Sequence, residues 1–280
     1  MGFKEFGPWM LSLAALAQFW IYLLWVNRRG RGKLEAFDTG RVELGFDANG
    51  PLIGLAGVLR AHAGEVFVRS LEVTLTADKD GIPRRFRWMA SKPEFLPSLE
   101  AAGSWEMPHP FPVSAGATRR FNAVFQDPEA AADMQVLLLA YRQEWREAEA
   151  KVQERRTKRM PGEGDPDAAM KEAVSEFKRK EICAESYTLM DRRCYWEPGS
   201  YTLTLAVRAE GPVAGLSRSV AAGGNFRFNL GKHEAKRLKA NCIAILDEPI
   251  CAALGRASAP IQAVLAEFEG APARAGLSPK

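Results

Sequence analysis

Residues 65–76, EVFVRSLEVTLT, decide the fold class, because they form the clearest half-buried strand pattern in the chain. From Leu71 to Thr76 apolar and polar residues alternate, which is the period that places one face of a strand against a core. The DKDG segment at residues 78–81 then predicts a turn. The same alternation recurs on both sides of this stretch, so the chain is predicted to be mainly β.

The other alternating segments lie at residues 42–46, 52–60, 85–88, 118–126, 201–208 and 226–230. Turn-forming residues separate them, and the strand–helix–strand alternation typical of a parallel sheet is not seen. About seven short strands with turn signals are typical of an immunoglobulin-like β-sandwich. We therefore expect residues 40–126 and 195–230 to form the two parts of one such sandwich.

Between these two parts, at residues 127–184, the sequence changes to helical spacing. Asp127 is a good N-cap acceptor, and Pro128 suits the first helical position. Apolar residues then recur at heptad spacing, at Met134, Leu138, Tyr141, Trp145, Ala148 and Val152. A glycine- and proline-containing break at residues 160–164 precedes a second helix. We expect a long helical hairpin inserted in the sandwich, short C-terminal helices at residues 231–269 and a flexible tail at 270–280.

The hairpin carries the candidate interaction residues. Tyr141 and Trp145 lie on the heptad stripe, and a basic cluster follows at the far end of the first helix, namely Arg155, Arg156, Lys158 and Arg159. The stripe is predicted to dock another protein or a second copy of the chain, and the basic cluster is predicted to meet phosphate, an acidic partner or lipid headgroups. The alternatives are that the stripe packs inside the hairpin and that the basic cluster is a solvated surface balanced by nearby glutamates.

The N-terminal residues 8–26, PWMLSLAALAQFWIYLLWV, contain no charged residue. As a helix they would span roughly 28 Å, close to the hydrocarbon thickness of a bilayer. This predicts a transmembrane anchor with interfacial aromatic residues and one polar side chain, at Trp9, Gln18, Trp20, Tyr22 and Trp25. A cleaved secretory signal and a buried core helix are the alternatives.

A basic juxtamembrane linker at residues 27–39 follows the anchor and is predicted to set its topology, through Arg28, Arg29, Arg31 and Lys33. The positive-inside rule then places the rest of the chain in the cytoplasm, as the domain of a single-pass membrane protein contacting the lipid bilayer. The opposite orientation, with an exported domain, stays open because of the cysteines.

Four cysteines occur, at Cys183, Cys194, Cys242 and Cys251. They form no C-x-x-C motif, and the three histidines are far apart in sequence, so the spacing of a zinc site is missing. In a cytoplasmic domain we expect four buried thiols. In an exported domain we expect two local disulfides, Cys183–Cys194 and Cys242–Cys251.

The sequence contains none of the motifs of serine hydrolases, zinc proteases, P-loop proteins or dinucleotide-binding folds, so we expect no catalytic residue, cofactor or metal. The net charge of +4 is mild and gives no reason to expect nucleic acid. The expected function is a membrane-anchored, non-catalytic binding or assembly module that presents a β-sandwich and a helical arm to a protein partner. The alternatives are an exported domain that binds a ligand or envelope component, and an unrecognised membrane-bound enzyme.

Overall fold

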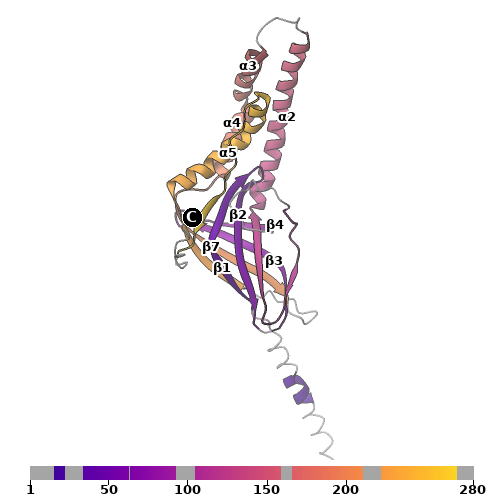
Figure 1. Ribbon diagram of the computed structural model, residues 1–280, viewed down its shortest axis with the longest axis vertical. Helices are drawn as coiled ribbons and strands as arrows, with labels where there is room; N and C mark the ends of the chain where they lie inside the picture. The colour runs from indigo at the N-terminus through magenta and orange to yellow at the C-terminus, as the bar shows by residue number, and fades with distance from the viewer. Residues whose placement is uncertain are drawn as a thin grey trace, which may run out of the picture.

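The computed structural model describes residues 16–22, 34–62, 64–92, 105–158, 166–210 and 222–269. Its mainly β character, expected from the sequence, is confirmed (Figure 1). The described strands are β1 (Leu34–Asp47), β2 (Gly50–Ala61), β3 (Val66–Ala77), β4 (Pro83–Ser91), β5 (Phe111–Val113), β6 (Thr118–Gln126), β7 (Gly199–Glu210), β8 (Ala222–Leu230) and β9 (Val264–Glu267).

These strands form one antiparallel sheet that is nearly closed on itself. The strand order is β8-β7-β3-β4-β6-β2-β1-β9, and the short β5 pairs with β3 beside this path. The two ends of the order meet, because Phe268 bridges to Phe228 and the Glu269 N–H donates to the Arg227 carbonyl at 2.7 Å. The prediction of an immunoglobulin-like sandwich is therefore wrong. Alternation shows that a strand has one buried face. It does not show whether that face packs against a second sheet or lines the interior of the strand's own curved sheet.

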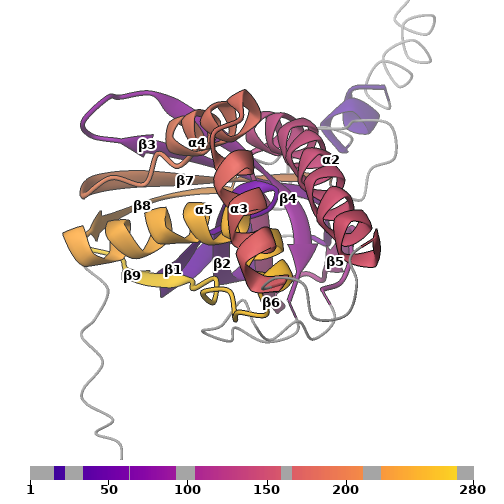
Figure 2. The ribbon, with the colours of Figure 1, turned by 90° about the horizontal axis from the view of Figure 1, so that it is seen from above.

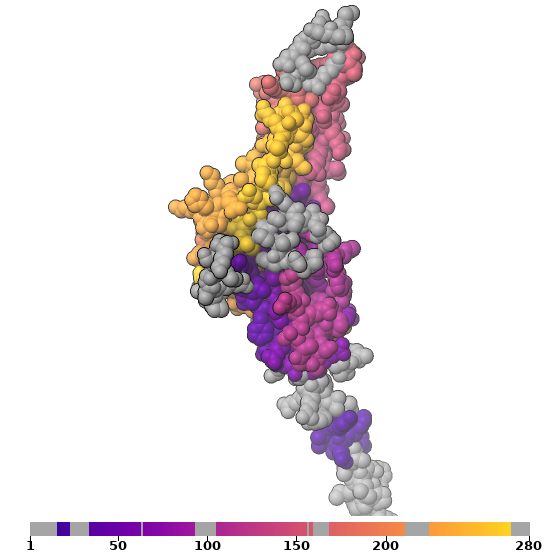
Figure 3. Space-filling model, viewed as in Figure 1, coloured from indigo at the N-terminus to yellow at the C-terminus, as the bar shows by residue number. Residues whose placement is uncertain are grey.

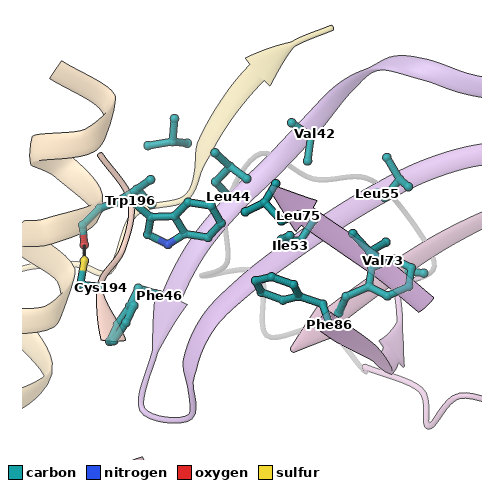
Figure 4. Packing of buried hydrophobic residues seen from close by; sticks show 14 of the residues in the cluster. Val42, Leu44, Phe46, Ile53, Leu55, Val73, Leu75, Phe86, Cys194 and Trp196 are labelled. Carbon is teal, nitrogen blue, oxygen red and sulfur yellow. Dashed lines mark hydrogen bonds between the residues drawn. The ribbon is translucent and has the colours of Figure 1, made fainter. Parts of the chain in front are cut away.

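The core fills the inside of this curved sheet and continues into the helices. In Figure 4 the Trp196 indole points toward the strands, near Leu44 and Leu75. Its Nε1–H donates to the Gly45 carbonyl at 3.2 Å, so the large ring is buried with its polar atom satisfied. Other core residues drawn there are Val42, Phe46, Ile53, Leu55, Val73 and Phe86.

Four long helices gather at one end of the sheet, where they form the arm of the molecule (Figures 1 and 2). They are α2 (Pro128–Lys158), α3 (Pro166–Lys178), α4 (Glu181–Arg193) and α5 (Lys232–Ala253). Within the range expected to be a hairpin, the return segment is two helices, because the chain turns at Arg179 and Lys180 before α4 begins. Figure 3 shows α5, in yellow, packed beside α2, in pink.

The segment that closes the sheet was expected to be a helix. In residues 264–268 the buried side chains are Val264, Ala266 and Phe268, whereas Leu265 and Glu267 are exposed. This is the period of a strand. The expectation of short C-terminal helices is corrected accordingly, since one long helix, α5, is followed by a loop and β9.

The prediction of a single-pass membrane protein is also corrected. Among the residues that the structure describes, no helix is both long enough and apolar enough to cross a bilayer. Of the expected anchor at 8–26, the structure describes only residues 16–22, which are helical and in which Gln18, Trp20 and Tyr22 are exposed.

Several other predicted residues at the two ends of the chain lie outside the described ranges, namely Trp9, Trp25, Arg28, Arg29, Arg31, Lys33 and the tail at 270–280. Of the expected linker at 27–39, residues 34–39 belong to β1. The predicted cytoplasmic placement and the bilayer as a partner both rested on the anchor.

Candidate functional site

The arm begins at the helix start that the sequence predicts. The Asp127 carboxylate accepts hydrogen bonds from the backbone N–H groups of Glu129 and Ala130, at 2.9 and 3.1 Å. Its other oxygen accepts the Tyr195 hydroxyl at 3.3 Å. The cap therefore joins α2 to the segment that leads into β7, and α2 then rises about 46 Å over its 31 residues.

The heptad stripe of α2 packs inside the arm. Tyr141 and Trp145 are only 1% and 2% exposed. Both contact the buried ring of Phe177 on α3 edge-on, with centroids 5.0 and 5.2 Å apart. The two aromatic residues that the sequence suggested as interaction residues thus hold the arm together and are not accessible to a partner.

Charged contacts brace the same helices on their outer edges. Lys180 pairs with Glu144, and Arg193 pairs with Asp133. The Lys180 ammonium lowers the pKa of Glu144. On the α4–α5 side, the Tyr187 hydroxyl donates to Asp247 at 3.4 Å, and burial raises the pKa of Tyr187 to about 12. These contacts connect α2, α4 and α5, and Phe177 joins α3 to the same unit.

The face of α2 opposite the heptad stripe carries apolar side chains in solvent. Val136 is 73% exposed and Leu139 is 71% exposed, and Ala132 is also exposed. Ala132, Val136, Leu139 and Gln143 follow one another at spacings of four, three and four, so they lie along one face of the helix. We call these four residues the outer face of α2.

The basic cluster at the end of α2 is only partly within the described residues. Arg155 and Lys158 are exposed, and Lys158 pairs with Glu154 at 2.7 Å. Arg159 and the side chain of Arg156 lie outside the described part of the chain. The described part of this cluster is therefore a solvated helix surface with an internal ion pair.

A cavity of about 540 Å³ lies at the base of the arm, between β4, the start of α2 and the end of α4. Its arginines include Arg84 and Arg193, which pair with Asp80 and Asp133. The Arg84 guanidinium also lies 4.4 Å above the Tyr195 ring. This last contact lies between β4 and the segment that links α4 to β7, so the cavity lies where the arm meets the sheet.

The structure groups the cysteines differently from the disulfide pairs that the sequence suggests for an exported domain. All four are free thiols. Cys183 and Cys194 lie at opposite ends of α4, about 16 Å apart along its axis, and Cys242 and Cys251 are separated by about 13 Å along α5. Neither pair meets the geometry of a disulfide, which requires Cα atoms within about 7 Å. Instead, the structure brings Cys194 and Cys242 together.

The histidines do not gather into a site either. His62 contacts Glu35, His109 faces the Met107 carbonyl at 3.3 Å, and His233 is exposed near the start of α5. Within the described ranges, no three side chains among histidine, cysteine, aspartate and glutamate are arranged to hold a metal ion.

Comparison with protein-family models, with curated proteins and with solved structures found no match for this chain. The candidate site therefore rests on the geometry of the arm alone.

Sequence reasoning missed the outer face of α2, although the sequence carried a signal for it. Val136 to Leu139, VLLL, are four consecutive apolar residues. A heptad stripe uses two positions in seven, so a continuous apolar run must also place side chains on the opposite face.

Proposed function

We propose that this protein is a non-catalytic binding module that presents the outer face of α2 to an apolar groove on a partner protein. The observation that carries the proposal is the exposure of Val136 and Leu139, at 73% and 71%, on a helix whose other face is fully packed. Exposed apolar groups on a rigid surface are typical of protein interaction sites.

The spacing of the outer face fits one recognition mode in particular. A helix that docks in a groove uses anchors three and four residues apart along one face, which is the arrangement of Ala132, Val136 and Leu139. The packing of α2 against Phe177 also means that the helix is formed before binding. Such preorganisation lowers the entropic cost of association.

The proposal is tested by changing the outer face without changing the fold. The double variant Val136→Gln/Leu139→Gln keeps good helix formers at exposed positions and removes the apolar anchors. In quantitative co-purification from the native host, we expect it to lose a partner that the unaltered chain retains, with an unchanged melting temperature. The matched control, Val136→Ile/Leu139→Met, keeps the anchors apolar and should retain the partner.

Equal recovery of every partner by the glutamine variant and the control would contradict the proposal. If the retained partner is a second copy of the chain, the glutamine variant will also sediment as a smaller species than the control.

A further inference from the structure

Cys194 and Cys242 form a buried thiol pair between two parts of the arm. Cys194 is the C-cap residue of α4, and Cys242 lies in the middle of α5. They are 6% and 3% exposed. Both sulfur atoms lie near one backbone oxygen, the Leu238 carbonyl, at 3.9 Å from Cys194 Sγ and 3.7 Å from Cys242 Sγ. Figure 4 shows the Cys194 sulfur beside Trp196 at the edge of the core.

The chemistry of the two thiols is unequal. The neighbouring Cys242 thiol lowers the pKa of Cys194. The neighbouring Cys194 thiol, together with burial, raises the pKa of Cys242. Cys194 is therefore the sulfur that more readily carries the negative charge needed for nucleophilic attack.

We propose that Cys194 and Cys242 form an intramolecular disulfide when the folded protein meets a hydroperoxide. The Cys194 thiolate attacks one peroxide oxygen, and the O–O bond breaks. Hydroxide departs, and Cys194 becomes a sulfenic acid. The Cys242 sulfur then attacks Cys194 Sγ, the S–O bond breaks, and water leaves with the Cys242 proton. In total, two thiols and one hydrogen peroxide give one disulfide and two waters.

The position of the pair gives this bond a structural consequence. It would tie α5, which leads into the strand that closes the sheet, to the junction between α4 and β7. The bond would close a loop of roughly 50 residues, long enough for a marked loss of entropy in the unfolded chain.

Peptide mapping of the full chain after peroxide treatment tests the proposal. Cleavage after lysine and arginine and before aspartate places each cysteine on its own peptide, at residues 181–190, 194–208, 240–246 and 247–256. We expect a linked pair of the 194–208 and 240–246 peptides, absent from Cys194→Ser and Cys242→Ser. The melting temperature should rise by several degrees on oxidation and fall back on reduction.

The control variant Cys183→Ser/Cys251→Ser retains only the proposed pair and should show the same link and the same rise. This control keeps the test valid if a serine at position 194 or 242 prevents folding. The proposal is overturned if no linked pair forms at a peroxide concentration that oxidises Cys251, if the link involves Cys183 or Cys251, or if the control variant fails to gain stability.

Discussion

At the scale of single residues, one glycine explains a buried charge. Gly54 on β2 lies opposite Glu43 on β1, and a Cβ at this position would come within 2.8 Å of Glu43 Oε2. The missing side chain leaves room for the Glu43 carboxylate, which pairs with Lys92 Nζ at 3.1 Å. Both side chains are buried, so each charge depends on the other.

This dependence predicts an unequal pattern of stability losses. Lys92→Met leaves the Glu43 carboxylate buried without its partner and should lower the free energy of unfolding by about 3 kcal/mol. The double variant Glu43→Leu/Lys92→Met removes both charges and should lose much less. Urea denaturation of Lys92→Met, Glu43→Leu and the double variant measures this coupling. Losses that simply add would show that the two side chains do not depend on each other.

A second residue-scale prediction concerns tyrosine ionisation. Burial raises the pKa of Tyr141, Tyr187, Tyr195 and Tyr201, that of Tyr187 to about 12. In the unfolded chain these groups ionise near pH 10. Between about pH 10 and 12 the unfolded chain therefore holds fewer protons than the folded chain. The stabilisation that these protonated tyrosines give the folded chain is present below pH 10. The free energy of unfolding should therefore fall as the pH rises from about 10 to about 12.

Chemical denaturation at a series of alkaline pH values measures this fall, and Tyr187→Phe should make it less steep. In absorbance titrations of the native protein, the difference between the unaltered chain and Tyr187→Phe isolates one phenol. Ionisation of that phenol near pH 10 would contradict the account.

At the scale of elements, the sequence predicts helices and strands where local chemistry decides them. The cap at Asp127, the heptad stripe of α2 and the alternation in β3 each follow from side chains close in sequence. The strand character of residues 264–267 was missed because so short an apolar segment also fits one helical turn, and only its pairing with β1 distinguishes the two. The spacing of the apolar residues in α2 does not reveal that α3 covers the heptad stripe.

The arm should open locally when its central ring is removed. Phe177→Ala deletes the ring that contacts Tyr141 and Trp145, and its expected cost is about 3–5 kcal/mol. Hydrogen exchange should become faster in α3 and the middle of α2, while β3 and β7 remain protected.

The matched control is Lys171→Ala, an exposed position on the same helix, whose effect should stay within about 0.5 kcal/mol. Equal loss of protection in the sheet and the arm would mean that the two unfold as one unit.

At the scale of the whole molecule, the closure of the sheet depends on contacts far apart in sequence. β9 pairs with β1, and Phe268 packs against Phe226 and Phe228 on β8, with centroids 5.0 and 6.3 Å apart. No local pattern encodes this meeting of the first and last strands of the order. This is why the sequence predicts most of the strands correctly and their arrangement wrongly.

Phe268→Ala should therefore loosen the closure of the sheet. We expect the free energy of unfolding to fall by about 3 kcal/mol. Hydrogen exchange should become faster in β8 and β1, because β9, the neighbour of both strands, is held less firmly. Leu265→Ala, on the exposed side of β9, should have a smaller effect. If β8 keeps its protection in Phe268→Ala, then Phe268 does not hold the closure.

The interaction proposal also belongs to the whole molecule, because it requires the arm to present the outer face of α2 to a partner. A photoreactive phenylalanine analogue at position 139, in cells of the native host, tests it most directly. The control carries the same group at Met107, which is exposed and belongs to the segment between β4 and β5. The account predicts a discrete cross-linked protein from position 139 that is missing from position 107. No adduct at 139, or the same adducts from both positions, would contradict the claim that this face binds a partner.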